Sequence, residues 1–296
     1  MSRTRANLIL LLAGAMWGMG FVAQSTAMQA IGPFLFVGLR FAVATLAMLP
    51  LALMEQARAP AQLAARHWRA FGAIGLILFG GMAAQQIGLM TTTVTNSGFL
   101  TGTYVVMVPF LAVLIYRQWP HPAVWGGALL TLVGIWLLSG GGLTALTTGD
   151  WLTLLCALFW ALQVLLISRY AAETGRPVTL AVVQFAVCGA IGLGAAFALE
   201  PIAIAPIAEA LPEILYAGIF SGGIAFTLQV IGQRYTTAPQ AAIFLSTEAV
   251  FAAIFGAFLL GERLPPMGFV GCALIFAAIL VVELLPAMRQ RRGLTP

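Results

Sequence analysis

The chain carries very little charge: it has no lysine, a single aspartate and two histidines among its 296 residues. Charged residues make up 8% of the chain, whereas a soluble domain carries about a quarter. Hydrophobic residues make up 61%, and the mean hydropathy is +1.00. This composition excludes an ordinary soluble globule, because there are too few polar groups to cover its surface.

Motifs for catalysis and metal binding are also missing. The sequence contains no HExxH, Walker or GxSxG motif and no cluster of carboxylates, and His67 and His121 lie far apart. Cys156, Cys188 and Cys272 lie inside apolar runs and form no CxxC pair, which is typical of small core residues. We therefore expect no enzymatic activity, no cofactor and no metal site.

Long apolar runs, in contrast, fill most of the chain. Each run is long enough, at about 1.5 Å per residue, to cross a hydrocarbon core of about 30 Å as a helix. The first run continues past a stretch that resembles a signal-peptide cleavage site, so we interpret it as an uncleaved helix. The pattern predicts an all-α integral membrane protein with ten transmembrane helices, over residues 8–28, 34–54, 69–90, 97–116, 122–140, 151–168, 178–199, 212–233, 240–260 and 266–285.

The arginines occupy alternate gaps between these runs. The basic gaps contain Arg3, Arg5, Arg58, Arg66, Arg69, Arg117, Arg169, Arg176, Arg234, Arg289, Arg291 and Arg292, whereas the other gaps contain only Arg263 and five acidic residues. Basic loops stay on the cytoplasmic side of a membrane, so both termini are expected in the cytoplasm. The arginines are scattered singly, which argues against a nucleic-acid partner in spite of a pI near 9.6.

The sequence also repeats itself. The stretch 97–103 resembles 242–248 at an offset of 145, and Trp17 matches Trp160 at an offset of 143. The repeat unit then holds five helices, and an odd number forces the second unit to enter from the opposite face. We expect a first repeat over 1–140, an external linker over 141–150 and a second repeat over 151–296. Inverted repeats with a site at their interface are typical of transporters.

These residues resemble the EamA-type branch of the drug/metabolite transporter superfamily, over the whole chain. The resemblance rests on Trp17 and Trp160 after small residues, on Arg40, and on the run 246–251 followed by Gly-Glu-Arg-Leu at 261–264. Ala249 departs from the family's usual proline. The family implies a ten-helix transporter, and the chain is most similar to bacterial inner-membrane exporters of amino acids and other metabolites.

Polar and aromatic side chains inside the apolar runs are the candidate substrate-binding residues. Polar groups facing lipid are costly, so most should face the interior, where they can line a pathway or join helices by hydrogen bonds. The two tryptophans lie too deep for an interfacial belt and either wall a cavity or pack in the core. The candidates are Trp17, Gln24, Gln85, Gln86, Thr101, Tyr104, Trp160, Gln163, Gln229 and Ser246.

Three further residues are candidates for coupling or gating. Glu248 is the deepest acid of the chain and could carry a proton, bind a substrate ammonium or pack against a polar neighbour. Arg40 could bind a substrate carboxylate, or extend to the outer interface. Pro109 lies inside a predicted helix and should kink it, which would suit a hinge.

The most consistent function is export of a small polar metabolite by alternating access between the repeats. A neutral polar lining favours amino acids, with hydrophobic or aromatic side chains preferred. Glu248 leaves open an exporter of organic cations, and a membrane scaffold without transport is a further alternative. The expected partners are the solute and membrane lipids, and ten helices can enclose a pathway within one chain.

Overall fold

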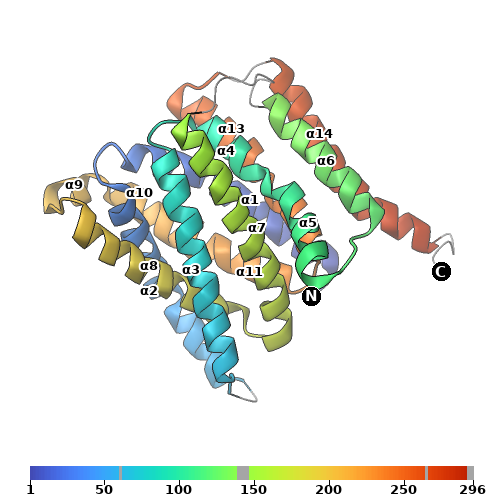
Figure 1. Cartoon of the computed structure of the whole chain (residues 1–296), viewed down its shortest axis with the longest axis horizontal. Coiled ribbons are helices and arrows are strands. Elements are labelled where there is room, and N and C mark those ends of the chain that lie inside the picture. The colour runs from blue at the N-terminus through green and yellow to red at the C-terminus, as the bar shows by residue number, and fades with distance from the viewer. Residues whose placement is uncertain (60–61, 139–146, 264–265, 292–296) are drawn as a thin grey trace.

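The computed structural model of the chain describes residues 1–59, 62–138, 147–263 and 266–291 (Figure 1). Within these residues the secondary structure is helical. The elements are α1 (Arg3–Ala27), α2 (Pro33–Ala57), α3 (Ala65–Gly88), α4 (Val94–Gly102), α5 (Tyr104–Tyr116), α6 (Pro122–Leu138), α7 (Thr148–Thr174), α8 (Pro177–Leu199), α9 (Ile204–Glu209), α10 (Leu211–Leu215), η1 (Tyr216–Ala225), α11 (Phe226–Gln233), α12 (Ala238–Leu245), α13 (Glu248–Leu260) and α14 (Pro266–Arg291).

The helices account for the predicted apolar runs. Eight helical stretches of the described chain are long and apolar enough to span a membrane, and α6 and α14 contribute two shorter apolar helices. All-helical, membrane-compatible architecture is thus confirmed, while ten crossings stay a prediction. Of the predicted linker over 141–150, residues 141–146 lie outside the described residues. Residue 147 precedes α7, which begins at Thr148.

Three predicted helices are interrupted. The run 97–116 divides at Thr103 into α4 and α5, and the run 240–260 divides at Ser246 and Thr247 into α12 and α13. The run 212–233 contains the π-helix η1 between α10 and α11. The first break lies six residues before Pro109, which sits inside the continuous α5. Broken and π-helical segments concentrate at functional sites of membrane proteins.

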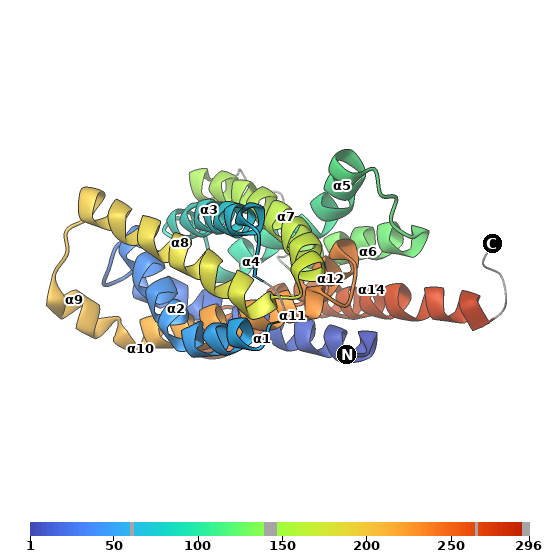
Figure 2. The ribbon, with the colours of Figure 1, turned by 90° about the horizontal axis from the view of Figure 1, so that it is seen from below.

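Helix packing has a recurring pattern. Helix α3 of the first half packs on α7 and α8 of the second half. In the same way, η1 of the second half packs on α1 and α2 of the first half. Helix α1 also packs on α13, as α7 does on α5. The equivalent helices α2 and α8 lie side by side, and α6 and α14 form a pair at the opposite edge of the molecule (Figures 1 and 2). Each contact between helices of the two repeats therefore has a counterpart in which the equivalent helices of the two repeats are exchanged.

The basic gaps meet at one end of the bundle. Arg66 contacts Glu173 at the end of α7, Arg176 contacts Gln56 at the end of α2, and Arg3 contacts Gln240 at the start of α12. The remaining gaps meet at the other end, where Thr92 contacts Asp150 and Glu262 accepts a hydrogen bond from the backbone N–H of Val94. The gaps that contain arginine in the sequence thus lie together in the structure and form a basic end of the molecule.

Candidate functional site

A small cavity lies where the two halves of the chain meet. Its volume is about 20 Å³, which is room for a single water molecule, so the bundle is closed around it. The walls come from seven elements, α1, α2, α3, α7, η1, α11 and α13. The lining residues are Trp17, Phe21, Gln24, Arg40, Met82, Gln85, Trp160, Ser221, Phe226 and Glu248.

Aromatic rings form one side of this cavity. The ring centroids of Trp17 and Trp160 lie 5.8 Å apart, and Phe226 lies 4.7 Å from Trp17 and 5.4 Å from Trp160. The indole Nε1 of Trp17 donates a 3.0 Å hydrogen bond to the backbone oxygen of Ser221. Two tryptophans that are equivalent in the sequence repeat therefore meet at the centre, where their rings can receive an apolar or aromatic group.

Arg40 is held inside the protein and does not extend to an interface. It is the eighth residue of α2 and is 1% exposed, and its guanidinium lies 5.0 Å from the ring centre of Phe41. Its Nη2 donates a 3.3 Å hydrogen bond to Ser221 Oγ, on the π-helix. Its Nε and Nη1 have no hydrogen-bond partner among the described residues. Buried donors of this kind are costly unless a ligand or water satisfies them.

Glu248 faces the same cavity from the other half of the chain. It is the first residue of α13, directly after the break in the helix, and it is 5% exposed. Its Oε1 has no hydrogen-bond partner among the described residues, and Tyr104, the first residue of α5, lies beside it. Both interrupted helices thus resume at the centre of the protein.

Arg40 and Glu248 do not neutralise each other. Glu173 forms ion pairs with Arg66 and His67, whereas among the described residues no ion pair joins Arg40 to Glu248. A guanidinium and a carboxyl group therefore line one cavity with unsatisfied atoms on both. A ligand that carries an anionic group and a cationic group would complement them.

Other predicted residues divide between this cavity and the surrounding helix contacts. Gln24 and Gln85 line the cavity, and Gln85 Nε2 also donates to Thr101 Oγ1 at 3.0 Å. Gln86 Nε2 donates to the backbone oxygen of Gln24 at 3.2 Å, which joins α3 to α1. The hydroxyl of Ser246, directly after α12, donates to the carbonyl of Ile243 in the last turn of that helix.

Gln163 and Gln229 belong to a chain of amides instead. Gln229 Nε2 donates to Gln163 Oε1, and Gln163 Nε2 donates to Gln184 Oε1, both at 3.1 Å. These three side chains come from α11, α7 and α8, and they are not among the residues that line the cavity. The arrangement is that of interhelical hydrogen bonding, which is worth about 0.6 kcal/mol per bond in membrane proteins.

Comparison with known proteins assigns the chain to a family. The model of the EamA-like transporter family matches residues 4–140 and again residues 147–284. The chain belongs to the EamA-like transporter family. An uncharacterized transporter of Archaeoglobus fulgidus is 34% identical over 284 residues, covering 95% of this chain and 87% of that protein. The uncharacterized transporter YwfM of Bacillus subtilis is 25% identical over 293 residues, covering 96% and 95%.

The fold of this EamA-like transporter also matches a solved structure. The similarity has a TM-score of 0.78 at 20% sequence identity and covers 96% of this chain and 98% of the solved chain. At that level of identity the match shows the shared fold. The family model and both relatives match over nearly the whole length of this chain, so the resemblance to this family seen in the sequence is confirmed.

Sequence reasoning missed three residues that wall the cavity of this EamA-like transporter: Phe21, Met82 and Phe226. All three are apolar residues within apolar runs, so nothing in their local sequence separates them from residues that face lipid or the core. Ser221 is visible only as a polar residue within a run. Its role between Trp17 and Arg40 depends on the π-helix, which no residue pattern predicts.

Proposed function

We propose that this protein exports amino acids across the bacterial inner membrane, with aromatic and hydrophobic side chains favoured. The observation that carries the proposal is a guanidinium and a carboxyl group with unsatisfied atoms in one cavity, those of Arg40 and Glu248. The α-carboxylate of the solute pairs with Arg40, and its ammonium group pairs with Glu248. Trp17, Trp160 and Phe226 receive the side chain.

The proposed mechanism is alternating access between two inverted repeats. The antiparallel packing of the equivalent helices α2 and α8 supports it: the side chain of Glu55 at the end of α2 reaches the start of α8, and Glu200 at the end of α8 reaches the start of α2. The two matches to the family model, one in each half, also support it. In this mechanism the basic end of the bundle, with both termini, lies in the cytoplasm.

The site must widen to admit a solute, because about 20 Å³ holds no amino acid. The breaks at Thr103 and at Ser246–Thr247 are the proposed hinges, since the regular i→i−4 hydrogen bonding gives way there to i→i−3 bonds, from the N–H of Thr103 to Leu100 O and from the N–H of Thr247 to Phe244 O. Pro109 is a further point of weakness in α5, because it lacks a backbone N–H. Tyr104 and Glu248 move with the half-helices that follow the breaks.

Transport in liposomes tests the assignment. Three compounds separate the two charges: phenylalanine has both, phenethylamine lacks the carboxylate, and 3-phenylpropionate lacks the ammonium group. Wild-type protein should carry phenylalanine best. Arg40→Gln and Glu248→Gln should each lower that flux about tenfold or more, because each leaves a buried charge of the solute unpaired. Arg58→Gln, an exposed arginine of the basic end, serves as the control.

An exporter of organic cations is the second candidate, because Glu248 is a buried acid with an unsatisfied oxygen. It requires that phenethylamine be carried better than phenylalanine and that Arg40→Gln leave this flux unchanged. A scaffold would carry none of the three compounds. Repeating the assay with and without a pH gradient tests whether transport is coupled to protons. If the flux of Glu248→Gln no longer depends on the gradient, Glu248 is the residue that carries the coupled proton.

A further inference from the structure

A second, larger hollow opens at the basic end of the bundle. It has a volume of about 450 Å³ and lies between the last turn of α5, the last third of α7 and the start of α12. A neighbouring hollow of about 320 Å³ shares Ala112, Gln118, Thr237 and Pro239 with it. Small-molecule sites measure about 300–1,000 Å³. We call the first hollow the vestibule; it has the size of a binding site, which the closed central cavity lacks.

The vestibule carries a positive charge in a fixed position. Arg169 lines it, and the guanidinium lies 5.1 Å from the ring centre of Tyr116 and 5.8 Å from that of Tyr170. Two aromatic faces therefore restrain an otherwise exposed side chain. Of the described residues that line the vestibule and its neighbour, none is acidic.

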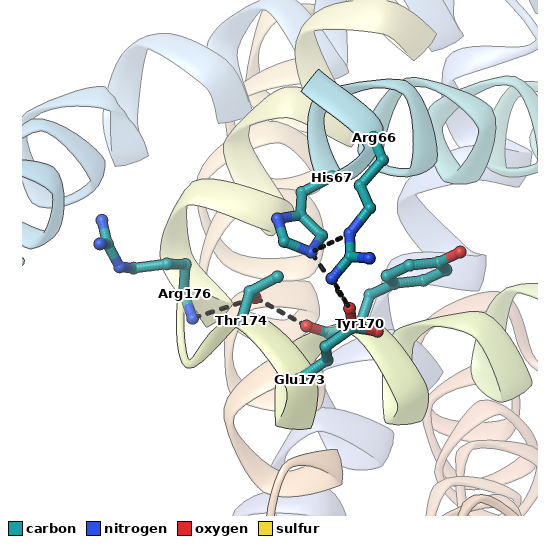
Figure 3. Close-up of polar contacts among 6 residues, drawn as sticks. All are labelled: Arg66, His67, Tyr170, Glu173, Thr174 and Arg176. Carbon is teal, nitrogen blue, oxygen red and sulfur yellow. Dashed lines mark hydrogen bonds and ion pairs between the residues drawn. The ribbon is translucent and has the colours of Figure 1, made fainter. Parts of the chain in front are cut away.

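The acid that comes closest to Arg169 along α7 is engaged elsewhere. Glu173, one turn further on, accepts a 3.1 Å hydrogen bond from Arg66 Nη2, and its Oε1 lies 3.1 Å from His67 Nε2. Figure 3 shows this carboxylate turned towards the start of α3. The guanidinium of Arg169 thus remains available to an anion that enters the vestibule.

Polar and apolar groups complete the wall. Ser168 and Thr236 bring hydroxyls, and Thr236 Oγ1 is buried without a hydrogen-bond partner among the described residues. Leu165 forms an apolar floor. It lies five residues after Trp160, the wall of the central cavity, which is about 7.5 Å along a helix. The vestibule therefore ends about one and a half turns from the central site.

From these features we propose that the vestibule is a second binding site, at which Arg169 pairs with the carboxylate of the transported amino acid before the solute reaches Arg40 and Glu248. The inference rests on the proposed amino-acid transport. Leu165 and Ala112 receive the apolar side chain, and the hydroxyl of Thr236 accepts a hydrogen bond from the ammonium group. Loading then begins at the end of the protein where solute collects for export.

Concentration dependence of phenylalanine flux in liposomes tests this site. Arg169→Gln should raise KM about fivefold to tenfold while the maximal rate stays within twofold, because the first contact is lost and the central site is intact. Thr236→Val should raise KM by a smaller factor. Arg58→Gln is the matched control, since it removes an exposed arginine from the same end outside the vestibule. Inhibition by phenethylamine, which has no carboxylate, should be unchanged in Arg169→Gln.

Equal KM values for Arg169→Gln and Arg58→Gln would overturn the vestibule site while leaving the transport assignment intact. A parallel loss of phenethylamine inhibition would overturn it too, because the arginine would then act on something other than a carboxylate. Measurements in liposomes with and without anionic lipid distinguish an amino-acid carboxylate from a lipid phosphate at Arg169. An increase in KM that appears only with anionic lipid would assign Arg169 to a lipid phosphate and overturn the vestibule site. Wild-type protein without amino-acid flux would overturn both proposals.

Discussion

Glu55 and Glu200 cap each other's helices. The carboxylate of Glu55, near the end of α2, accepts hydrogen bonds from the backbone N–H groups of Val178 and Thr179 at the start of α8, at 3.1 and 2.7 Å. Glu200, 145 residues further along, accepts from those of Phe34 and Leu35 at the start of α2, both at 2.8 Å. The same capping contact therefore occurs twice, once at each end of the α2–α8 pair, and it joins the two helices at both ends.

Reciprocal capping predicts equal effects of two distant substitutions. Glu55→Gln and Glu200→Gln should each lower the free energy of unfolding by about 0.5–2 kcal/mol, because each removes a carboxylate from a helix N-terminus that has no other side-chain cap. Thermal unfolding in detergent, followed by circular dichroism, measures the change. Glu209→Gln, at the exposed last residue of α9, should change nothing. A large loss at only one site would contradict the equivalence of the two caps.

Close packing of α1 on α13 predicts a strong effect of one methyl group. A Cβ on Gly18 would clash with Phe251 Cβ and would lie 2.7 Å from the backbone nitrogen of Ala252. Gly18→Ala should therefore cost about 1–3 kcal/mol of stability, or separate the helices and abolish transport. Gly126→Ala meets no atom within 4 Å and is the matched control. Unfolding curves and liposome flux of the two variants decide between these outcomes.

Backbone strain at one loop predicts a stabilising substitution. Arg117 follows α5 with φ of 53°, and Gly261 follows α13 with φ of 69°, so equivalent helix ends use the left-handed conformation. Only glycine adopts it without steric cost. Arg117→Gly should raise stability by about 1 kcal/mol, and Gly261→Ala should lower it by a similar amount. Melting temperatures that move in the same direction would contradict this account.

The aromatic wall predicts a change of substrate preference. Trp160→Ala removes a ring that lies 5.4 Å from Phe226 and 5.8 Å from Trp17. Affinity for phenylalanine should fall about tenfold, corresponding to roughly 1.4 kcal/mol of lost ring contact, whereas affinity for alanine should fall little. Competition of both amino acids against labelled phenylalanine measures this. Trp68→Ala, at an exposed position, controls for loss of a tryptophan; equal losses for both amino acids would argue against a side-chain pocket.

Much of this architecture was predictable from the sequence. Apolar runs predict the helices because a helix alone satisfies its own backbone in lipid, and the alternation of arginine predicts which loops meet at one end. The central breaks were not predictable: Pro109 drew attention to α5, yet the helix divides at Thr103. Gly102 directly before this break is a weak helix former, but Ser246 and Thr247 at the second break are ordinary residues, so that interruption depends on the surrounding packing.

Within the candidate site, the sequence by itself determined which residue types were unusual: a buried arginine, a buried acid, amides and two deep tryptophans. Only the tertiary structure decided which of them meet. Arg40 and Glu248 line one cavity, while Gln163 and Gln229 bond to each other outside it. The physical reason is that the cost of a polar group in lipid indicates only that the group turns inward, and does not indicate which other helix it meets there. That choice is made by contacts between helices more than a hundred residues apart.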